Sequence, residues 1–135
     1  MKFDVKNCIG CGICALVCPF GGRKIFDDVK EGLREIKYYP DKCVKCELCK
    51  EICFCDAIKD EGNLSVLHEL VICEKCGGVI TTRTHLLYII NQLGEKYYAN
   101  QTLRKIMAEE IGLQTEDLKL CPDCLREEYK KVRAR

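Results

Sequence analysis

The sequence has little of what substrate-converting active sites are built from. It contains one serine and two histidines, and it has neither a nucleophile–base pair nor a phosphate-binding glycine loop. Gly10 and Gly12 do not complete the G-x-G-x-x-G pattern of a dinucleotide site. These absences argue against a catalytic centre carried by this chain alone, so we expect a non-catalytic protein.

Long apolar runs and a dominant charge are also missing. The longest apolar run that contains no cysteine is residues 86–90, far short of the roughly 18 residues that span a membrane. Residues 1–7 lack the apolar stretch of a signal peptide, so we expect a cytoplasmic chain with reduced thiols and no membrane span of its own. A formal charge of +1 gives no basic field, so nucleic acid is not an expected partner.

Cysteine is the abundant residue, with 13 in 135 positions. A disulfide scaffold is the simplest reading of a small cysteine-rich chain. The odd number and the expected reducing compartment argue against it. Twelve of the thirteen also lie in short spacings typical of metal ligands. Metal binding is therefore the better interpretation.

Two runs of four cysteines repeat each other. Both have the spacing C-x-x-C-x-x-C-x-x-x-C, and a shift of 35 positions superimposes one on the other. The same shift pairs three apolar positions, namely Ile9 with Val44, Ile13 with Leu48, and Val17 with Ile52. Cysteine and apolar positions that recur together indicate an internal duplication.

This spacing is that of bacterial two-cluster ferredoxins, and residues 1–60 resemble the two-[4Fe-4S] ferredoxin family. The resemblance implies two hairpin-and-helix halves related by a pseudo-twofold axis and holding two cubane clusters. In such proteins the fourth cysteine of each run binds the other cluster. The expected ligands are Cys8, Cys11, Cys14 and Cys53 for the first cluster, and Cys43, Cys46, Cys49 and Cys18 for the second.

The second run departs from the family pattern after its last cysteine. Phe54 stands where the family usually has proline, and Cys55 follows it. Asp56-Ala57-Ile58 matches the end of the family's motif, which makes Cys53 the ligand and places Cys55 at an apolar packing position. The alternative, in which Cys55 replaces Cys53, disagrees with the C-x-x-x-C spacing.

The other four cysteines form two pairs, one in C-x-x-C-G and one in C-P-x-C. They are Cys73, Cys76, Cys121 and Cys124. Two such pairs make a tetrahedral four-sulfur site, which suits zinc or a rubredoxin-type iron. A third cubane is a further possibility, but widely separated pairs favour a single ion. Zinc held by four thiolates would be structural, since no position stays open for water.

Helical periodicity fills the interval between these pairs. One stripe ends before Gly94 and a second before Gly112; they comprise Leu86, Ile89, Ile90 and Leu93, then Leu103, Ile106, Met107 and Ile111. Alternation over residues 33–39 predicts a strand before Pro40. We therefore expect an α+β chain with a pseudo-twofold two-[4Fe-4S] ferredoxin domain over residues 1–62. A small helical domain over residues 63–135 follows, clipped by a zinc-ribbon-like four-cysteine site.

The layout from Cys8 to Cys124 is similar to the family of formate hydrogenlyase subunit 6 and the iron-sulfur subunit of energy-converting hydrogenases. That family is related to the two-cluster subunit of respiratory complex I. The resemblance implies an electron-transfer subunit that docks other redox subunits, among them a [NiFe]-hydrogenase small subunit. The complex would be membrane-associated through its other subunits. The balanced charge also favours a docked subunit, because mobile ferredoxins use acidic faces for steering.

Two other functions are compatible with the same motifs. One is a soluble ferredoxin, or an electron-transfer subunit of another enzyme such as a tungsten or molybdenum oxidoreductase. The other is a metal-stabilised adaptor without redox function. Two complete sets of cluster ligands favour the redox functions over the adaptor.

Overall fold

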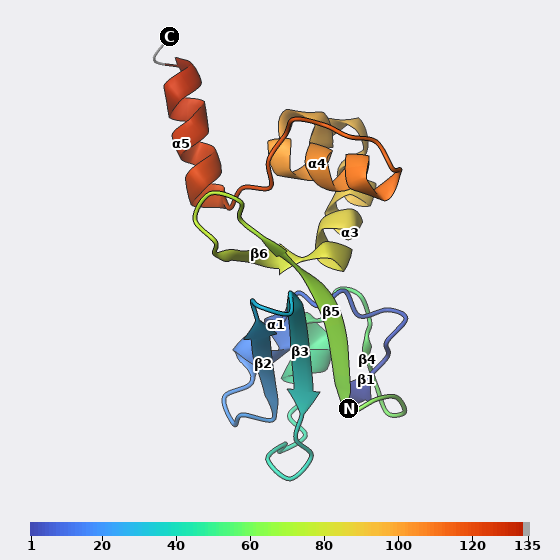
Figure 1. The fold of residues 1–135 in the computed structure, drawn as a ribbon. Coiled ribbons are helices and arrows are strands. Elements are labelled where there is room, and N and C mark those ends of the chain that lie inside the picture. The colour runs from blue at the N-terminus through green and yellow to red at the C-terminus, as the bar shows by residue number, and fades with distance from the viewer. Residues whose placement is uncertain (134–135) are drawn as a thin grey trace. The chain divides into compact units, whose positions relative to one another are not determined.

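The computed structural model describes residues 1–133, so the last two positions of the expected second domain lie outside the described residues. The chain divides into two compact units, Met1–Glu69 and the part that begins at Leu70 (Figure 1). Each combines helix with strand, in agreement with the α+β expectation.

The first unit consists of two copies of a strand–helix–strand arrangement. Its elements are β1 (Lys2–Phe3), α1 (Ile13–Val17), β2 (Arg23–Asp28), β3 (Leu33–Tyr38), α2 (Leu48–Ile52) and β4 (Ile58–Lys59). The shift of 35 positions carries α1 onto α2 residue for residue, and it carries the start of β2 onto the start of β4. β3 ends before Pro40, as the alternation predicts.

Strand pairing follows the same duplication. β1 and β4 are antiparallel with Phe3 opposite Ile58, and β2 and β3 are antiparallel with Arg23 opposite Tyr38. The shift takes Phe3 to Tyr38 and Arg23 to Ile58. One pair is therefore the pseudo-twofold image of the other, and Phe3, Tyr38 and Ile58 are all part of one apolar core.

Left-handed backbone conformations also repeat. Three glycines with positive φ have non-glycine counterparts with positive φ, namely Gly10 and Lys45, Gly12 and Glu47, and Gly21 and Asp56. Such conformations strain residues that carry a Cβ. The loops that carry the cysteines thus have the same backbone shape in both halves, although only the first half has glycine at these positions.

Strand β5 (Ser65–Ile72) continues the chain into the second unit. Within the first unit it is antiparallel to β3, with Ser65 opposite Lys37 and Glu69 opposite Leu33. From Leu70 it pairs with β6 (Val79–Thr82). The domain boundaries 1–62 and 63–135 expected from the sequence remain a proposal.

The second unit contains the helices that the sequence predicts. α3 (Arg83–Leu93) covers the first periodic stripe, and α4 (Gln101–Glu110) covers the second except for Ile111, its exposed C-cap, with the 3-10 helix η1 (Gly94–Ala99) between them. The Thr82 side chain accepts from the His85 N–H, and that of Asn100 accepts from the Leu103 N–H, so both helices have side-chain N-caps. α5 (Pro122–Arg133) begins directly after Cys121 and contains Cys124 in its first turn.

The helices of the second unit enclose a separate apolar core. Its buried residues are Val71, Leu86, Ile90, Leu103 and Ile106. Four of these five belong to the two predicted stripes, so the helical periodicity identified most of this core. Val71 comes from β5, whose extent the sequence does not predict.

Candidate iron-sulfur and metal centres

The first cavity of the N-terminal unit is lined by thiols from both repeats. It includes all four cysteines expected for the first cluster, Cys8, Cys11, Cys14 and Cys53, and also Cys55. The other lining residues are apolar side chains such as Phe3, Ile36 and Ile58, together with glycine. A hollow with convergent thiols and an apolar wall suits a group bound through sulfur and shielded from water.

The second cavity is built in the same way from the other set. Its thiols are Cys43, Cys46, Cys49 and Cys18, which are those expected for the second cluster. In both cavities, three cysteines come from one repeat and the fourth from the other. Cys49 is buried and Cys46 is exposed, so this cavity runs from the core to the surface.

Backbone N–H groups donate to the cysteine sulfurs in a repeated pattern. Gly22 donates to Cys18 Sγ at 3.2 Å, and Ala57, its counterpart, donates to Cys53 Sγ at 3.4 Å. Such donors stabilise a thiolate ligand. Since Cys53 repeats the contact that Cys18 makes, the geometry favours Cys53 over Cys55 as the fourth ligand of the first cavity.

Burial keeps two thiols of the first cavity protonated in the absence of a cation. It raises the pKa of Cys8 to about 11 and that of Cys14 to about 12, and the remaining thiols nearby act in the same direction. Metal ligation requires thiolates, so iron entering this cavity displaces protons. The donor set therefore fits a cationic, sulfur-bound group.

Cys55 is a fifth thiol at the first cavity. Burial raises its pKa, and the neighbouring thiols Cys53 and Cys11 add to the shift. It is half-buried and stands 35 positions after Phe20, an apolar residue that lines the second cavity. The location thus corresponds to the apolar packing position expected from the sequence, and it also faces the cavity.

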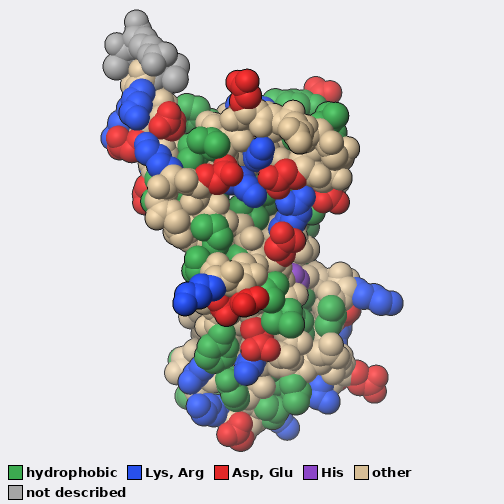
Figure 2. Space-filling view, viewed as in Figure 1, with side chains coloured by type: hydrophobic (Ala, Val, Ile, Leu, Met, Phe, Trp, Pro, Cys, Tyr) green, Lys and Arg blue, Asp and Glu red, His purple; other side chains and the backbone are tan. Residues whose placement is uncertain are grey.

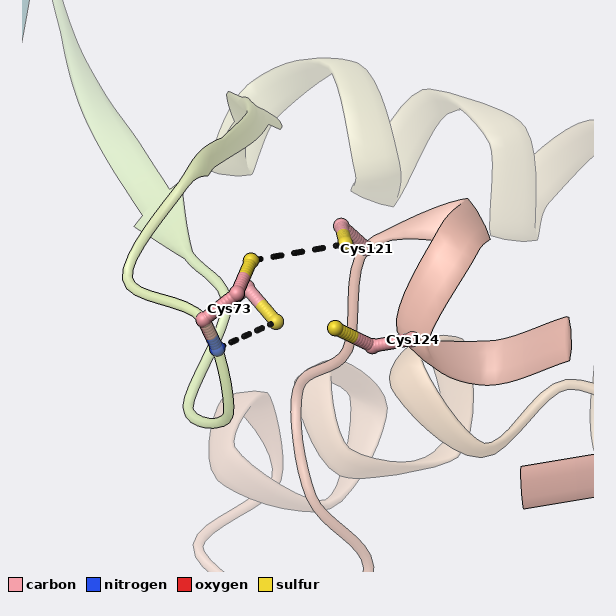
Figure 3. Close-up of side chains that lie close together, drawn as sticks. Cys73, Cys121 and Cys124 are labelled. Atoms are coloured by element: carbon pink, nitrogen blue, oxygen red, sulfur yellow. Dashed lines mark hydrogen bonds between the residues drawn. The ribbon is translucent and has the colours of Figure 1, made fainter. Parts of the chain in front are cut away.

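The second unit brings the two remaining cysteine pairs together (Figure 3). The Sγ atoms of Cys73, Cys76, Cys121 and Cys124 all lie within 4.8 Å of one another. Cys76 Sγ and Cys121 Sγ, which come from different pairs, are 3.7 Å apart. Four sulfurs around a zinc ion at about 2.3 Å would be separated by roughly 3.8 Å. This spacing is compatible with a single ion bound by the four sulfurs.

The first pair lies in the loop between β5 and β6. The Cys73 N–H donates to the Gly78 carbonyl at 2.8 Å, and the Gly77 N–H donates to the Cys73 carbonyl at 3.0 Å. Gly77 has a φ of 75°, so glycine is needed where the loop turns. The Cys76 and Gly78 N–H groups donate to Cys73 Sγ and Cys76 Sγ, each at 3.4 Å. This is the knuckle that C-x-x-C-G predicts.

Electrostatics in the knuckle favour a thiolate at Cys73. Burial raises its pKa, but the N–H groups of Cys76, Cys121 and Lys75 outweigh burial and hold the pKa at about 6. Hydrogen bonding to Cys121 raises the pKa of Cys124 to about 12. Four thiols at this distance cannot all ionise without a cation between them. The site therefore needs a cation to hold four thiolates together, as expected of an S4 metal site.

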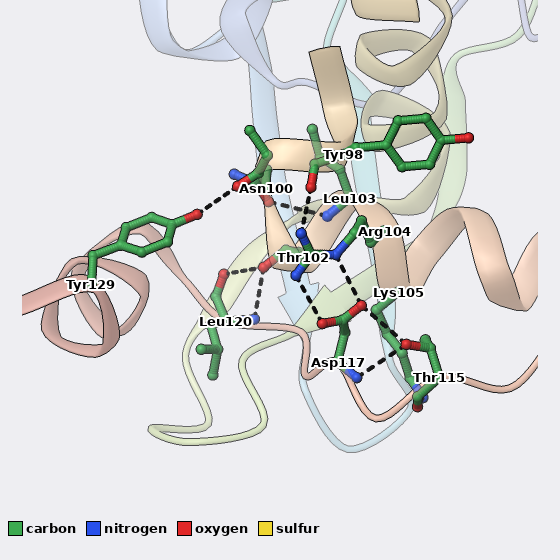
Figure 4. A network of polar contacts seen from close by, with 11 residues as sticks. Tyr98, Asn100, Thr102, Leu103, Arg104, Lys105, Thr115, Asp117, Leu120 and Tyr129 are labelled. Atoms are coloured by element: carbon green, nitrogen blue, oxygen red, sulfur yellow. Dashed lines mark hydrogen bonds and ion pairs between the residues drawn. The ribbon is translucent and has the colours of Figure 1, made fainter. Parts of the chain in front are cut away.

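The second pair stands at the first turn of α5, where Pro122 is the first helical residue. The Thr102 hydroxyl donates to the Leu120 carbonyl at 2.7 Å and accepts from the Leu120 N–H at 2.9 Å (Figure 4). Arg104 binds both carboxylate oxygens of Asp117 at 3.0 Å in the same segment. The buried Thr102–Leu120 bonds and the partly exposed Arg104–Asp117 pair together hold the chain before Cys121.

A backbone bridge connects the two cysteine pairs. The Glu74 N–H donates to the Lys119 carbonyl at 2.7 Å, and the Lys119 N–H donates to Glu74 Oε2 at 2.7 Å. The sequence gives no signal for this bridge or for Thr102, because neither belongs to a metal motif. Both nevertheless help to hold the two pairs close together.

Comparison with known proteins supports the N-terminal assignment. Residues 7–57 match the family of 4Fe-4S dicluster domains. The Hdr-like menaquinol oxidoreductase iron-sulfur subunit 1 of Archaeoglobus fulgidus is 39% identical over 64 residues, or 46% of this chain and 23% of that protein. An iron-sulfur subunit of the CoB–CoM heterodisulfide reductase of Methanocaldococcus jannaschii is 35% identical over 69 residues, or 42% of this chain and 10% of that protein.

A third relative is named in a similar way. It is one of the subunits of the H(2):CoB-CoM heterodisulfide,ferredoxin reductase of Methanothermobacter marburgensis, 32% identical over 71 residues, covering 43% of this chain and 11% of that protein. The chain thus spans less than a quarter of the length of these relatives. The matches support an iron-sulfur, electron-transfer role, but they do not extend to the formate hydrogenlyase subunit 6 family. Among the described residues, no helix has the length and apolar character needed to cross a bilayer.

Proposed function

We propose that this chain is a docked electron-transfer subunit of a multi-subunit oxidoreductase, with two [4Fe-4S] clusters and one zinc ion. The observation that carries the proposal is the pair of thiol-lined cavities, each of which contains the four cysteines expected for one cluster, three from one repeat and one from the other. When bound, a [4Fe-4S] cluster takes up and releases one electron at a time.

The protein supplies ligands, hydrogen bonds and exclusion of water. Cys8, Cys11, Cys14 and Cys53 would hold the first cluster, and Cys18, Cys43, Cys46 and Cys49 the second. Gly22 and Ala57 direct N–H groups at the two exchanged cysteines. Buried apolar residues, among them Phe3 and Ile36, form the inner wall and keep water away from the sulfurs.

Exposed apolar side chains at the cavities support a docked rather than a mobile subunit. Phe20 and Val44 line the second cavity and are 52% and 57% exposed, and Phe54 lines the first and is 51% exposed. Exposed apolar residues around a functional site are typical of protein interfaces. On the face in Figure 2, acidic and basic side chains are interspersed, without the one-sign patch that steers a diffusing carrier.

The four-sulfur site would serve structure rather than electron transfer. Zinc bound by Cys73, Cys76, Cys121 and Cys124 has no open position and no redox chemistry. It would close the loop formed by residues 77–120, which contains α3, η1 and α4. A rubredoxin-type iron is the alternative occupant with the same ligands.

Two parent complexes are supported by different observations. The layout from Cys8 to Cys124 resembles hydrogenase-linked subunits, which favours a complex that contains a [NiFe]-hydrogenase small subunit and is attached to the membrane through other subunits. The relatives are named as iron-sulfur subunits of heterodisulfide reductases and a related menaquinol oxidoreductase. These names favour a heterodisulfide reductase type of complex as the second candidate.

Anaerobic purification of the tagged chain from native cells tests the proposal. We expect about eight iron atoms per chain, four for each cluster, one zinc atom, and co-purifying redox subunits in the membrane or the soluble fraction. Nickel and a hydrogenase large subunit would identify the first complex, and heterodisulfide reductase subunits the second. Recovery as an isolated chain that exchanges electrons in solution would contradict docking, and recovery without iron would contradict the redox function.

A further inference from the structure

Arg23 is a buried cation at the second cavity. It is the first residue of β2, its side chain is 2% exposed, and it lines the cavity together with Cys18, Cys43, Cys46 and Cys49. Arginine is seldom buried without an anionic partner, because an uncompensated charge costs several kcal/mol. Its surroundings therefore indicate what compensates it.

The protein satisfies this guanidinium only in part. Its central carbon lies 4.6 Å from the ring centroids of both Phe3 and Tyr38, and Nη2 donates to the Met1 carbonyl. Nη1 is buried and has no hydrogen-bond partner. Across the part of the chain that the structure describes, Arg23 forms no ion pair.

Arg34 is a second buried arginine of the same unit and provides the contrast. Its Nε and Nη2 bind the two carboxylate oxygens of Asp27 at 2.7 and 3.1 Å, and its Nη1 donates to the Gly10 carbonyl at 2.9 Å. The charge of Arg34 is therefore neutralised by the protein, whereas that of Arg23 is not. Only Arg23 is left with an unused donor and an uncompensated charge.

The duplication places no equivalent charge at the first cavity. The shift of 35 positions takes Arg23 to Ile58, which is 2% exposed and lines the first cavity. None of the residues that line that cavity carries a charged side chain. The second hollow therefore has the Arg23 guanidinium where the first has the apolar side chain of Ile58.

We infer that Arg23 provides the counter-charge for the second cluster and holds its reduction potential above that of the first. The inference rests on the proposed function, since it requires that both cavities bind clusters. A cluster with four thiolates is anionic and gains one more negative charge on reduction, and a nearby cation in an apolar wall stabilises the reduced form more. Electrons would therefore reside preferentially at the second cavity.

The position of Arg23 decides which cluster it affects more. It lines the second cavity and is not among the residues that line the first. We therefore expect a smaller effect on the first cluster than on the second.

A redox titration of the anaerobically loaded full-length chain tests the inference. EPR follows both clusters, and paramagnetically shifted cysteine β-proton signals in NMR assign each potential to its ligand set. Arg23→Met removes the charge but keeps an unbranched apolar side chain, and Arg23→Lys keeps the charge. Lys24→Gln is the matched control, because it removes one positive charge from an exposed neighbour on the same strand.

In Arg23→Met we expect the reduced-to-oxidised ratio of the second cluster at fixed potential to fall at least tenfold, which corresponds to about 59 mV for one electron. The first cluster should shift less, Arg23→Lys should stay close to wild type, and Lys24→Gln should leave the gap between the clusters intact. A second cluster that moves no more than the first, or no more than in Lys24→Gln, would overturn the inference.

Two further measurements distinguish failure of this inference from failure of the variant to fold and from failure of the proposed function. If Arg23→Met does not assemble its clusters, the wild-type titration decides. In the wild-type protein, the cysteine signals of the second cluster must show that it is reduced at a higher potential than the first. If the first cluster is reduced at the higher potential, the inference is overturned. Iron analysis of wild type comes first, because a chain that holds only one cluster or none would overturn the proposed function itself, and the inference with it.

Discussion

Glu47 has the same left-handed backbone as Gly12, its counterpart 35 positions earlier, with φ of 63° and 79°. A residue with a Cβ in this conformation costs about 1 kcal/mol or more relative to glycine. We therefore expect Glu47→Gly to stabilise the metal-loaded protein by about 1 kcal/mol. Anaerobic denaturant unfolding measures the change, and an unaltered or lower midpoint would show that the loop relieves the strain in another way.

Substitution of Gly12 by alanine tests crowding at the equivalent loop of the first repeat. A Cβ on Gly12 would lie 2.5 Å from Ile25 Cδ1, whereas a Cβ on Gly32, which also has positive φ, would meet nothing within 4 Å. Gly12→Ala should therefore cost about 1 kcal/mol more than Gly32→Ala, because it adds a contact to the same backbone strain. Equal costs in thermal unfolding would mean that Ile25 moves aside freely.

Cys53 and Cys55 should behave differently when replaced. Cys53→Ala removes a sulfur that accepts from the Ala57 N–H, as Cys18 accepts from Gly22. We expect iron to fall from about eight to about four atoms per chain, since only the first cluster is lost. Cys55→Ala should keep both clusters in EPR. Loss of a cluster from the Cys55 variant, with Cys53→Ala unaffected, would reverse the ligand assignment.

Removal of the S4 metal should loosen the second unit selectively. The metal closes a loop over residues 77–120, and cross-links of this span contribute about 4 kcal/mol. Cys121→Ser should therefore lower the zinc content and the melting temperature of α3 and α4, measured by circular dichroism. Iron in the first unit should be retained. Ser65→Ala, outside the site, serves as the control, and unchanged melting without zinc would contradict a structural role.

His68 should make stability depend on pH. Burial lowers its pKa from 6.5, and the cross-strand Arg34 lowers it further. The folded state therefore favours neutral His68, so its contribution is complete above pH 6.5 and is lost as the pH falls below 6.5 through the folded pKa. The His68→Leu variant should lose less stability than wild type between pH 7.5 and 5.5 in anaerobic denaturant unfolding. Parallel pH profiles would exclude His68 as the origin.

Cysteine spacing predicted which thiols share a cavity, because a fixed ligand count and a short loop leave few arrangements. Periodicity predicted α3 and α4 for an equally local reason. The positive φ of Lys45, Glu47 and Asp56 was not recognised, since these side chains carry no mark of a left-handed position. The duplication does provide a signal for these positions, because each of the three residues aligns with a glycine of the first repeat.

Arg23 was missed for a different reason. A single basic residue after a cysteine run has the appearance of a surface residue, and its burial depends on the rings of Phe3 and Tyr38, which are distant in sequence. Alignment of the repeats offers one usable signal, the pairing of Arg23 with the apolar Ile58. No such signal predicts the Thr102–Leu120 contact or the Glu74–Lys119 bridge. Both are hydrogen bonds to backbone atoms, and a backbone atom can accept or donate whatever the residue type.

The exchange of Cys18 and Cys53 between the two cavities makes the N-terminal unit an internal dimer. One repeat alone has three sulfurs for its own cavity and one for a neighbour, so it could complete both sites only by associating with a second copy. Covalent linkage of the halves makes that association independent of concentration. It also permits what identical subunits cannot have, namely two sites of the same design whose lining residues differ, as Arg23 and Ile58 do.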